Sequence, residues 1–569
     1  MEKRQTQLNI DKRLFHIGTA VLAVLLFAAI VAFWVFYPDN LMHSDMAAEV
    51  ILAKLLNKEG ALVTPNWYYS TELRVVYSQL VMMPLFWLTS DFGVVKLVSI
   101  IVLNVLCCVS YYFVAKEFDI KKGAMWLSLA LLLAPLSTEY LDMMFLGNFY
   151  TAQTICTYLF LLFYFRVHTV GKVGERVTEG GERSGESDGK PMAADSKKQI
   201  VTLVLLCIGA FIVGLSGVRY LANMFLPLLA AVCWAYLFDR NDSFGVVKTD
   251  KGSEEGKNGR GMAWLGSGVR YAFPAIALTF FCGVGWMLNA KVLPKYYSFA
   301  DMGEVGFVRA DEILERLKGA LTMILEFVGF RFTGVTPRFA CVNALRIAFI
   351  ACSVIVLFVL TVHRKELLNV KERILLYFFH FGFILNFLME VFLTKDQEYR
   401  YYIPNYIVLV LLYGIFIREC VKKATWPKLF VVAVFALTAA STLYSELWQD
   451  TKYNDCEKRY GYMAFLTEQG YDYGYATFWN GPVTEYLANG EIHVVSVGGE
   501  AHETEPYRWL VPKAYLKPGF HEGKTFILLA RTEEVALTEG VISIMQDSEK
   551  VYEDEYYVIY EGSGMYLYD

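Results

Sequence analysis

The chain has 569 residues, of which 56% are hydrophobic, 16% aromatic and only 19% charged, and its formal net charge is -5 at pH 7. Soluble proteins carry about 25% charged residues, and nucleic-acid-binding proteins present a basic face, so this composition argues against both classes. The mean hydropathy of +0.37 comes from apolar blocks. Each block has about the length that a helix needs to cross a bilayer. The sequence therefore predicts an α-helical polytopic membrane protein.

Eleven apolar blocks predict transmembrane helices, because in lipid each backbone segment must satisfy its own hydrogen bonds. They cover residues 14–37, 94–115, 123–139, 148–165, 199–215, 221–238, 271–290, 342–362, 374–394, 403–418 and 428–445. The first block follows Lys12 and Arg13 and is too long for a signal peptide, so we interpret it as a retained signal anchor. The apolar run 77–88 is too short to span, and we expect an interfacial or re-entrant helix there.

The distribution of Lys and Arg between the short loops predicts the orientation. Loops 116–122, 363–373 and 418–428 carry eleven of these residues, and loops 139–148, 215–220 and 395–402 carry three. Short cytoplasmic loops are enriched in Lys and Arg, so the N-terminus is expected in the cytoplasm and the C-terminal tail outside the cell membrane. Segments 38–93 and 291–341 would then be outer loops of a membrane domain that covers residues 1–445.

Two inserts and the tail differ from the apolar blocks in composition. Residues 167–198 and 240–269 are rich in Gly, Ser, Glu and Lys, which is typical of disordered cytosolic linkers. The tail, residues 446–569, contains a helix-like run at 455–468 and β-like runs at 491–497, 525–530, 541–545 and 556–560. These runs predict a small exocytoplasmic α/β domain. Cys341 and Cys456 would both lie outside, where they could pair.

Two carboxylates follow the first predicted span. Asp45 and Glu49 are four residues apart and would share one face of a helix. Two carboxylates that face one cavity at the membrane surface can accept a proton or hold a divalent cation. The alternative is that Asp45 is an N-cap that stabilises the first turn of a helix.

This layout resembles the GT-C glycosyltransferases, above all the protein O-mannosyltransferases and the lipid A aminoarabinose transferases. The shared features are a first span ending in an acidic loop, an outer amphipathic segment, and a second span with a basic cytosolic end. The resemblance implies that Asp45 is the base or essential carboxylate, and that Asp142 is a second carboxylate rather than a solvated loop acid. In place of the family's Asp-Glu doublet the chain has Asp-x-x-x-Glu, and the His-Pro-Pro motif of the mannosyltransferases is absent. These departures leave the acceptor class open.

Three arginines are candidates for holding a phosphate. Arg219 stands between two spans beside glycines, and a guanidinium group matches two phosphate oxygens; snorkelling to lipid headgroups is the alternative. Arg400, Tyr401 and Pro404 form an Arg-Tyr-x-x-Pro pattern that is similar to one in several GT-C families, which implies a role at the donor phosphate. Its alternative is an aromatic belt with a snorkelling arginine. Arg74 is the third candidate.

The resemblance implies an inverting membrane glycosyltransferase that moves a sugar from a polyprenyl-phosphate donor to an extracytoplasmic glycan, lipid or protein. No cofactor is certain from the sequence, and a divalent metal at the three carboxylates is an open alternative. A glycan polymerase or ligase, a transporter or flippase, and a non-catalytic scaffold are the other readings. The apolar stretch 319–330 could guide a polyprenyl chain, and the run 474–482 suits either sugar stacking or packing within the tail.

Overall fold

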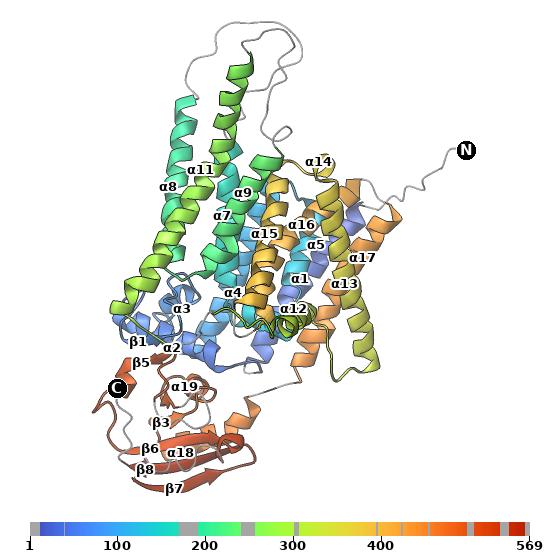
Figure 1. Cartoon of the computed structure of the whole chain (residues 1–569). Helices are drawn as coiled ribbons and strands as arrows, with labels where there is room; N and C mark the ends of the chain where they lie inside the picture. The colour runs from blue at the N-terminus through green and yellow to red at the C-terminus, as the bar shows by residue number, and fades with distance from the viewer. Residues whose placement is uncertain are drawn as a thin grey trace.

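The computed structural model of the chain describes residues 12–38, 40–169, 192–239, 256–300, 306–393, 397–422, 425–452, 454, 456–497, 506–534 and 546–563. Most of these residues form a bundle of helices, and a smaller β-containing unit lies against one end of it (Figure 1).

The rods of the bundle follow one another along the chain as α1 (Lys12–Phe36), α4 (Phe92–Glu117), α5 (Lys122–Leu133), α7 (Thr151–Thr169), α8 (Met192–Gly214), α9 (Leu226–Phe238), α11 (Gly256–Lys291), α13 (Pro337–Val362), α15 (Val370–Phe392), α16 (Ile403–Lys422) and α17 (Trp426–Thr442). Each of the eleven predicted spans falls on one of them. In the described part of the chain, nine helices are long and apolar enough to cross a membrane. The number is ten if one bent pair counts as a single span. The chain is therefore a helical membrane protein.

The bent pair corrects the predicted third span. Residues 123–139 were expected to form one helix, but α5 ends at Leu133, and the next helix (Thr138–Leu146) turns away by 106°. This second part consists of α6 (Thr138–Leu141) and a π-helical turn (Asp142–Leu146). Pro135 lies in the break, and a proline disfavours helical geometry in the residue before it. The predicted span 148–165 lies on α7, which is not one of the nine helices.

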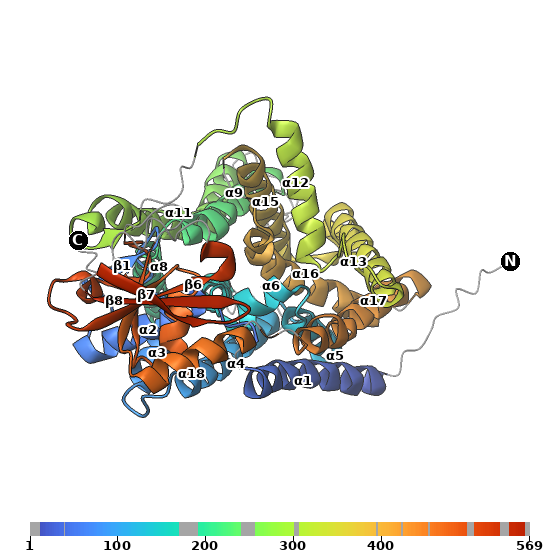
Figure 2. The ribbon, with the colours of Figure 1, turned by 90° about the horizontal axis from the view of Figure 1, so that it is seen from below.

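Short helices gather at one end of the bundle, which we call the domain end because the C-terminal unit lies there. They are α2 (Ser44–Glu59), α3 (Gln79–Leu85) and α12 (Ile313–Phe327). In Figures 1 and 2, α12 lies across the bundle axis, and it contains residues 319–327 of the predicted stretch 319–330. With seven residues, α3 is too short to span a bilayer, as the length of the run 77–88 indicated.

A three-stranded sheet joins three distant segments at the domain end. Its central strand β1 (Trp67–Tyr69) pairs in parallel with β2 (Ser298–Phe299) and antiparallel with β5 (Val511–Pro512). The two predicted outer loops and the tail are thus held together by backbone hydrogen bonds. The position of the C-terminal unit relative to α2 follows from this pairing.

The C-terminal unit is built on a five-stranded mixed sheet with the order β4-β3-β6-β8-β7. Its strands are β3 (Tyr473–Ala476), β4 (His493–Ser496), β6 (Lys524–Ala530), β7 (Gln546–Glu553) and β8 (Tyr557–Ser563), and its helices are α18 (Tyr460–Gln469) and α19 (Gly481–Leu487). The predicted helix and three of the four predicted strands are confirmed as α18, β4, β6 and β8. The fourth, 541–545, lies outside the described residues.

Two further expectations change. The predicted linkers 167–198 and 240–269 lie largely outside the described residues, but 192–198 and 256–269 are helical and lengthen α8 and α11. The possible disulfide between Cys341 and Cys456 is not formed in the structure. Cys456 is buried and accepts a hydrogen bond from Arg459 at 3.3 Å, whereas Cys341 is exposed on α13.

Candidate functional site

The first candidate carboxylate lies at the start of α2. The N-cap of this helix is His43, and its side chain makes no capping hydrogen bond. Asp45 is therefore the second helical residue and not the cap, which corrects the alternative interpretation. Its side chain is 38% exposed, as a group that meets a substrate must be. Glu49, one turn later, is only 3% exposed and forms an ion pair with Arg74 at 2.8 Å.

A histidine links Asp45 to the second candidate carboxylate. His43 Nε2 lies 2.9 Å from Asp142 Oδ2, and its Nδ1 lies 4.0 Å from Asp45 Oδ2. Its ring also stacks on Phe149, with 5.9 Å between the centroids. Burial alone would lower the pKa of His43, but the two carboxylates outweigh burial and raise it above its ordinary value. The imidazole thus holds Asp142 beside Asp45.

A buried lysine interacts with two of these carboxylates. Lys96 on α4 is fully buried and donates to the carbonyl oxygen of Gly147 at 3.2 Å. It interacts electrostatically with Glu49 and Asp142, so its charge partly balances both. Asp142 Oδ1 is buried and has no hydrogen-bond partner among the described residues. This oxygen is a free acceptor beside the candidate base.

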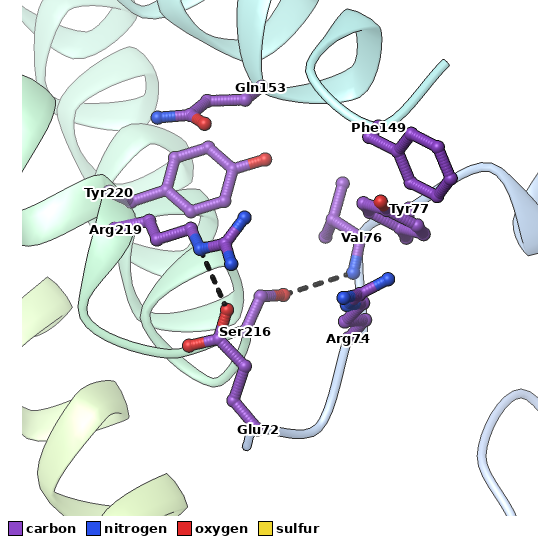
Figure 3. A pocket seen from close by; sticks show the side chains of 9 residues that line it. All are labelled: Glu72, Arg74, Val76, Tyr77, Phe149, Gln153, Ser216, Arg219 and Tyr220. Atoms are coloured by element: carbon purple, nitrogen blue, oxygen red, sulfur yellow. Dashed lines mark hydrogen bonds and ion pairs between the residues drawn. The ribbon is translucent and has the colours of Figure 1, made fainter. Parts of the chain in front are cut away.

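Two of the candidate arginines line one small open cavity of about 20 Å³ (Figure 3). Its walls are Glu72, Arg74, Val76, Tyr77, Phe149, Gln153, Ser216, Arg219 and Tyr220. The guanidinium groups of Arg74 and Arg219 enter from opposite walls, on the segment before α3 and on the turn after α8 (Figure 3). Buried Gln153 Nε2 lacks a hydrogen-bond partner among the described residues, so it remains a free donor there.

Each arginine of the cavity already has an acidic partner. Arg219 Nε lies 3.3 Å from Glu72 Oε1, and Arg74 pairs with Glu49 and covers the ring of Tyr77 at 4.7 Å. Such pairs keep two cations close together at a tolerable electrostatic cost. Any anion that entered the cavity would compete with the carboxylate of Glu72 for Arg219.

The turn that presents Arg219 depends on a glycine. Gly217 has φ +97, and a Cβ at this position would lie 1.6 Å from Glu72 Oε2. Ser216 Oγ accepts hydrogen bonds from the backbone N–H groups of Val75 and Val76 at 3.1 Å each. These contacts tie the turn after α8 to the segment that bears Arg74. They fix the separation of the two guanidinium groups.

An apolar groove of about 470 Å³ lies along α8 and α11. Its lining is Leu203, Val204, Cys207, Ile208, Phe211, Phe273, Ala277, Phe281 and Val284. Where the groove ends, the two helices are in backbone contact. A Cβ on Gly214 would lie 2.3 Å from the carbonyl oxygen of Cys282, and one on Gly285 equally close to that of Phe211. Phe211 lines the groove, and Ser216, five residues later, lines the arginine cavity.

The Arg-Tyr-x-x-Pro segment lies apart from the cavity. Arg400 interacts with Glu139 at 3.8 Å and Glu398 at 3.5 Å, and its guanidinium lies 5.9 Å from the Tyr401 ring. It does not line the cavity, although Tyr150 interacts electrostatically with both Arg219 and Arg400. The structure therefore brings Arg74 and Arg219 together and leaves Arg400 and Tyr401 beyond Tyr150.

The predicted metal alternative finds no support in the geometry. In the described ranges, no three His, Cys, Asp or Glu side chains are placed to hold a metal ion. Glu49 turns to Arg74, while Asp142 turns to His43. Asp45, Glu49 and Asp142 thus occupy one region without forming a common ligand set.

A second buried cluster lies between α13 and α17. The Arg346 side chain is fully buried, with NH2 3.8 Å from Glu446 Oε1 and 3.0 Å from Ser445 Oγ. Thr138, which opens α6, lies within hydrogen-bond distance of both Glu446 (3.4 Å) and Asp450 (3.2 Å). The cluster anchors the start of the helix whose next segment carries Asp142.

Sequence reasoning missed His43, Glu72 and Lys96. A lysine in the apolar block 94–115 was the available signal for Lys96, because ionisable groups in such blocks are rare and functional by default. His43 and Glu72 carried no periodic or spacing signal, since each meets its partner only through the fold. Comparison with protein-family models and with curated proteins finds no match to this chain.

Proposed function

We propose that this protein is a membrane glycosyltransferase that uses a polyprenyl-phosphate sugar as donor and transfers the sugar to an extracytoplasmic acceptor. The observation that supports this most is that two cavities of opposite character lie at the same end of α8. Phe211 lines an open groove with a purely apolar lining, and Ser216, five residues later, lines a cavity with two guanidinium groups. A phosphate attached to a long hydrocarbon chain is the ligand chemistry that matches both.

In this proposal, the domain end of the bundle faces the outside of the cell, as the Lys and Arg distribution favours. The isoprenoid tail occupies the groove between α8 and α11. Arg74 and Arg219 bind the phosphate once Glu72 has been displaced from Arg219, and the free amide of Gln153 donates to the donor headgroup. The sugar then lies toward Asp45.

The proposed reaction is a single displacement at the anomeric carbon. The acceptor hydroxyl oxygen forms the new bond to that carbon, while the bond from the carbon to the phosphate oxygen breaks. The electron pair leaves with the polyprenyl phosphate, whose added charge the two arginines stabilise. Asp45 accepts the hydroxyl proton. Attack from the face opposite the leaving group inverts the configuration.

His43 and Asp142 have positioning roles in this mechanism. The imidazole lies between the two carboxylates, so it offsets their mutual repulsion and holds Asp45 in place. Glu49 orients Arg74, and Lys96 balances the buried charge of Glu49. Arg400 does not line the cavity, and we assign it to the rim of the site.

The test uses the full chain in lipid nanodiscs, with a radiolabelled polyprenyl-phosphate sugar and a membrane extract as the source of acceptor. We expect Asp45→Asn to abolish transfer while binding of polyprenyl monophosphate and thermal stability remain near wild type. The matched control is Asp91→Asn, because Asp91 is an exposed N-cap at the same end and asparagine caps equally well. Normal transfer by the Asp45 variant would remove its role as base.

The transporter alternative predicts a different result. A flippase moves the intact lipid-linked glycan between leaflets, so no sugar would leave the phosphate in this assay. A product in which label and polyprenyl phosphate remain joined, with movement across the bilayer lost in the Arg219 variant, would favour transport over transfer.

A further inference from the structure

The C-terminal unit directs one particular edge of its sheet toward the membrane bundle. Strands β4, β3 and β6 are parallel, so their carboxyl ends lie at the same edge. In open parallel sheets, ligands bind in the crevice outside the carboxyl ends of the strands. At this edge the chain leaves β3 through Thr477–Asn480 and enters α19, which packs along α2 (Figure 1). The ligand-binding edge of the sheet thus faces the helix that carries Asp45.

An aromatic row, which we define as Trp479, Phe478, Tyr507 and Trp509, lies at this edge. The ring centroids of Trp479 and Phe478 are 5.4 Å apart, and those of Phe478 and Tyr507 are 5.7 Å apart. Tyr507 stacks on Trp509 with an interplanar angle of 22°. Phe478 is buried and anchors the row, whereas Trp479 is 61% exposed.

The loop that presents Trp479 is held firmly. Thr477 Oγ1 donates to Glu533 at 2.8 Å, and Asn480 Nδ2 donates to the same carboxylate at 3.4 Å. The backbone N–H of Asn480 also donates to the carbonyl oxygen of Thr477 at 3.0 Å. Because Thr477 and Asn480 fix the loop by hydrogen bonds, the exposed indole of Trp479 is preorganised for contact with a ligand.

The other end of the row reaches the candidate base. Pro506 forms a β-bridge with Val497, and Val511 pairs with Tyr68 of β1, so the intervening segment crosses from the sheet edge to the bundle. Burial and the nearby Asp45 carboxylate raise the pKa of Tyr507. The row therefore extends from an exposed indole to the neighbourhood of Asp45.

We propose that the aromatic row is the acceptor-binding surface and that the acceptor is a saccharide. Aromatic rings with one open face bind the C–H faces of sugar rings, while sugar hydroxyls remain free for attack. This inference rests on the proposed function, because it takes Asp45 as the group that accepts the acceptor's proton. A lipid acceptor would approach from the bilayer, whereas this row lies on the C-terminal unit.

The experiment measures binding without transfer. The full chain in nanodiscs is applied to an array of oligosaccharides from bacterial and fungal cell envelopes, and affinities for retained glycans are measured by interferometry. We expect Trp479→Ala to weaken binding about tenfold or more, and Trp479→Phe to keep most of it. The control is Trp87→Ala, because Trp87 is 71% exposed at the same end of the bundle but lies outside the row.

The outcomes separate this inference from the proposed function. Loss of glycan binding in Trp479→Ala, with polyprenyl monophosphate binding unchanged, supports the acceptor surface even if no transfer is detected. Three results would overturn it. They are a wild-type protein that retains no saccharide, equal retention by wild type and Trp479→Ala, and loss of polyprenyl phosphate binding together with glycan binding.

Discussion

Neutralising Arg219 and neutralising Glu72, one at a time, should change phosphate binding in opposite directions. Arg219→Gln removes a charged donor, and hydrogen bonds to charged groups contribute about 1.5–3 kcal/mol, or about 10- to 150-fold in affinity. Because the Arg219 side chain is 39% exposed, solvent screening places the effect near tenfold. Glu72→Gln removes the competing carboxylate, and a pair of this kind is worth up to about 1 kcal/mol. We therefore expect this variant to bind polyprenyl monophosphate about two- to fivefold more tightly.

The assay is equilibrium binding of polyprenyl monophosphate to the full chain in nanodiscs, with the uncharged polyprenol as reference ligand. Only the phosphate should respond to either substitution, and the difference should shrink as ionic strength rises. Arg309→Gln is the matched control, since Arg309 also pairs with an acid, Asp311 at 3.2 Å, but lies outside the cavity. Unchanged affinity in Arg219→Gln, or weaker binding in Glu72→Gln, would refute the assignment of this cavity to a phosphate.

Three further predictions concern pH and backbone geometry. The pKa of His43 is raised above its ordinary 6.5, so its contribution to stability is complete below pH 6.5 and is lost as pH rises through the folded-state value. Melting temperatures between pH 6 and 9 should therefore fall less steeply in His43→Gln, and equal slopes would contradict this. Burial raises the pKa of Asp450 from 3.8 to about 7, so Asp450→Asn should gain stability over wild type as pH rises from 4 to 7, by at most about 4 kcal/mol. Urea unfolding at both pH values measures this gain. A difference in unfolding free energy between variant and wild type that is the same at pH 4 and pH 7 would contradict the prediction. Gly217→Ala should weaken phosphate binding because an alanine at φ +97 strains the turn that positions Arg219, whereas Gly60→Ala, at φ +64 with open space, should add strain without changing binding.

The helical membrane class followed from local properties of the chain. A block of about 20 apolar residues must form its backbone hydrogen bonds internally wherever it lies in lipid, so its structure does not depend on distant residues. The predicted blocks fall on helices for this reason, except that the block 123–139 is interrupted after Leu133. Three predicted strands of the tail were also recognisable, because turn residues bound them. β3 was missed, since Tyr-Gly-Tyr-Ala is short and its glycine weakens the strand signal.

The candidate site could be predicted from the sequence only in part. Asp45, Glu49, Arg74 and Arg219 were found from residue type and position at one end of the predicted helices, and they do lie together. Their pairing could not be inferred. Arg219 was predicted to bind a phosphate, but in the structure it forms an ion pair with Glu72.

The sequence by itself determined which segments are helical and which polar residues lie at the ends of those helices. Only the tertiary structure decided their partners. Asp142 meets His43 across 99 residues, and the backbone of Asp450 meets Asn40 across 410. The physical reason is that hydrogen bonding within a helix is a local matter. The contact of two side chains from different helices depends instead on crossing angles and packing, which the whole bundle sets together.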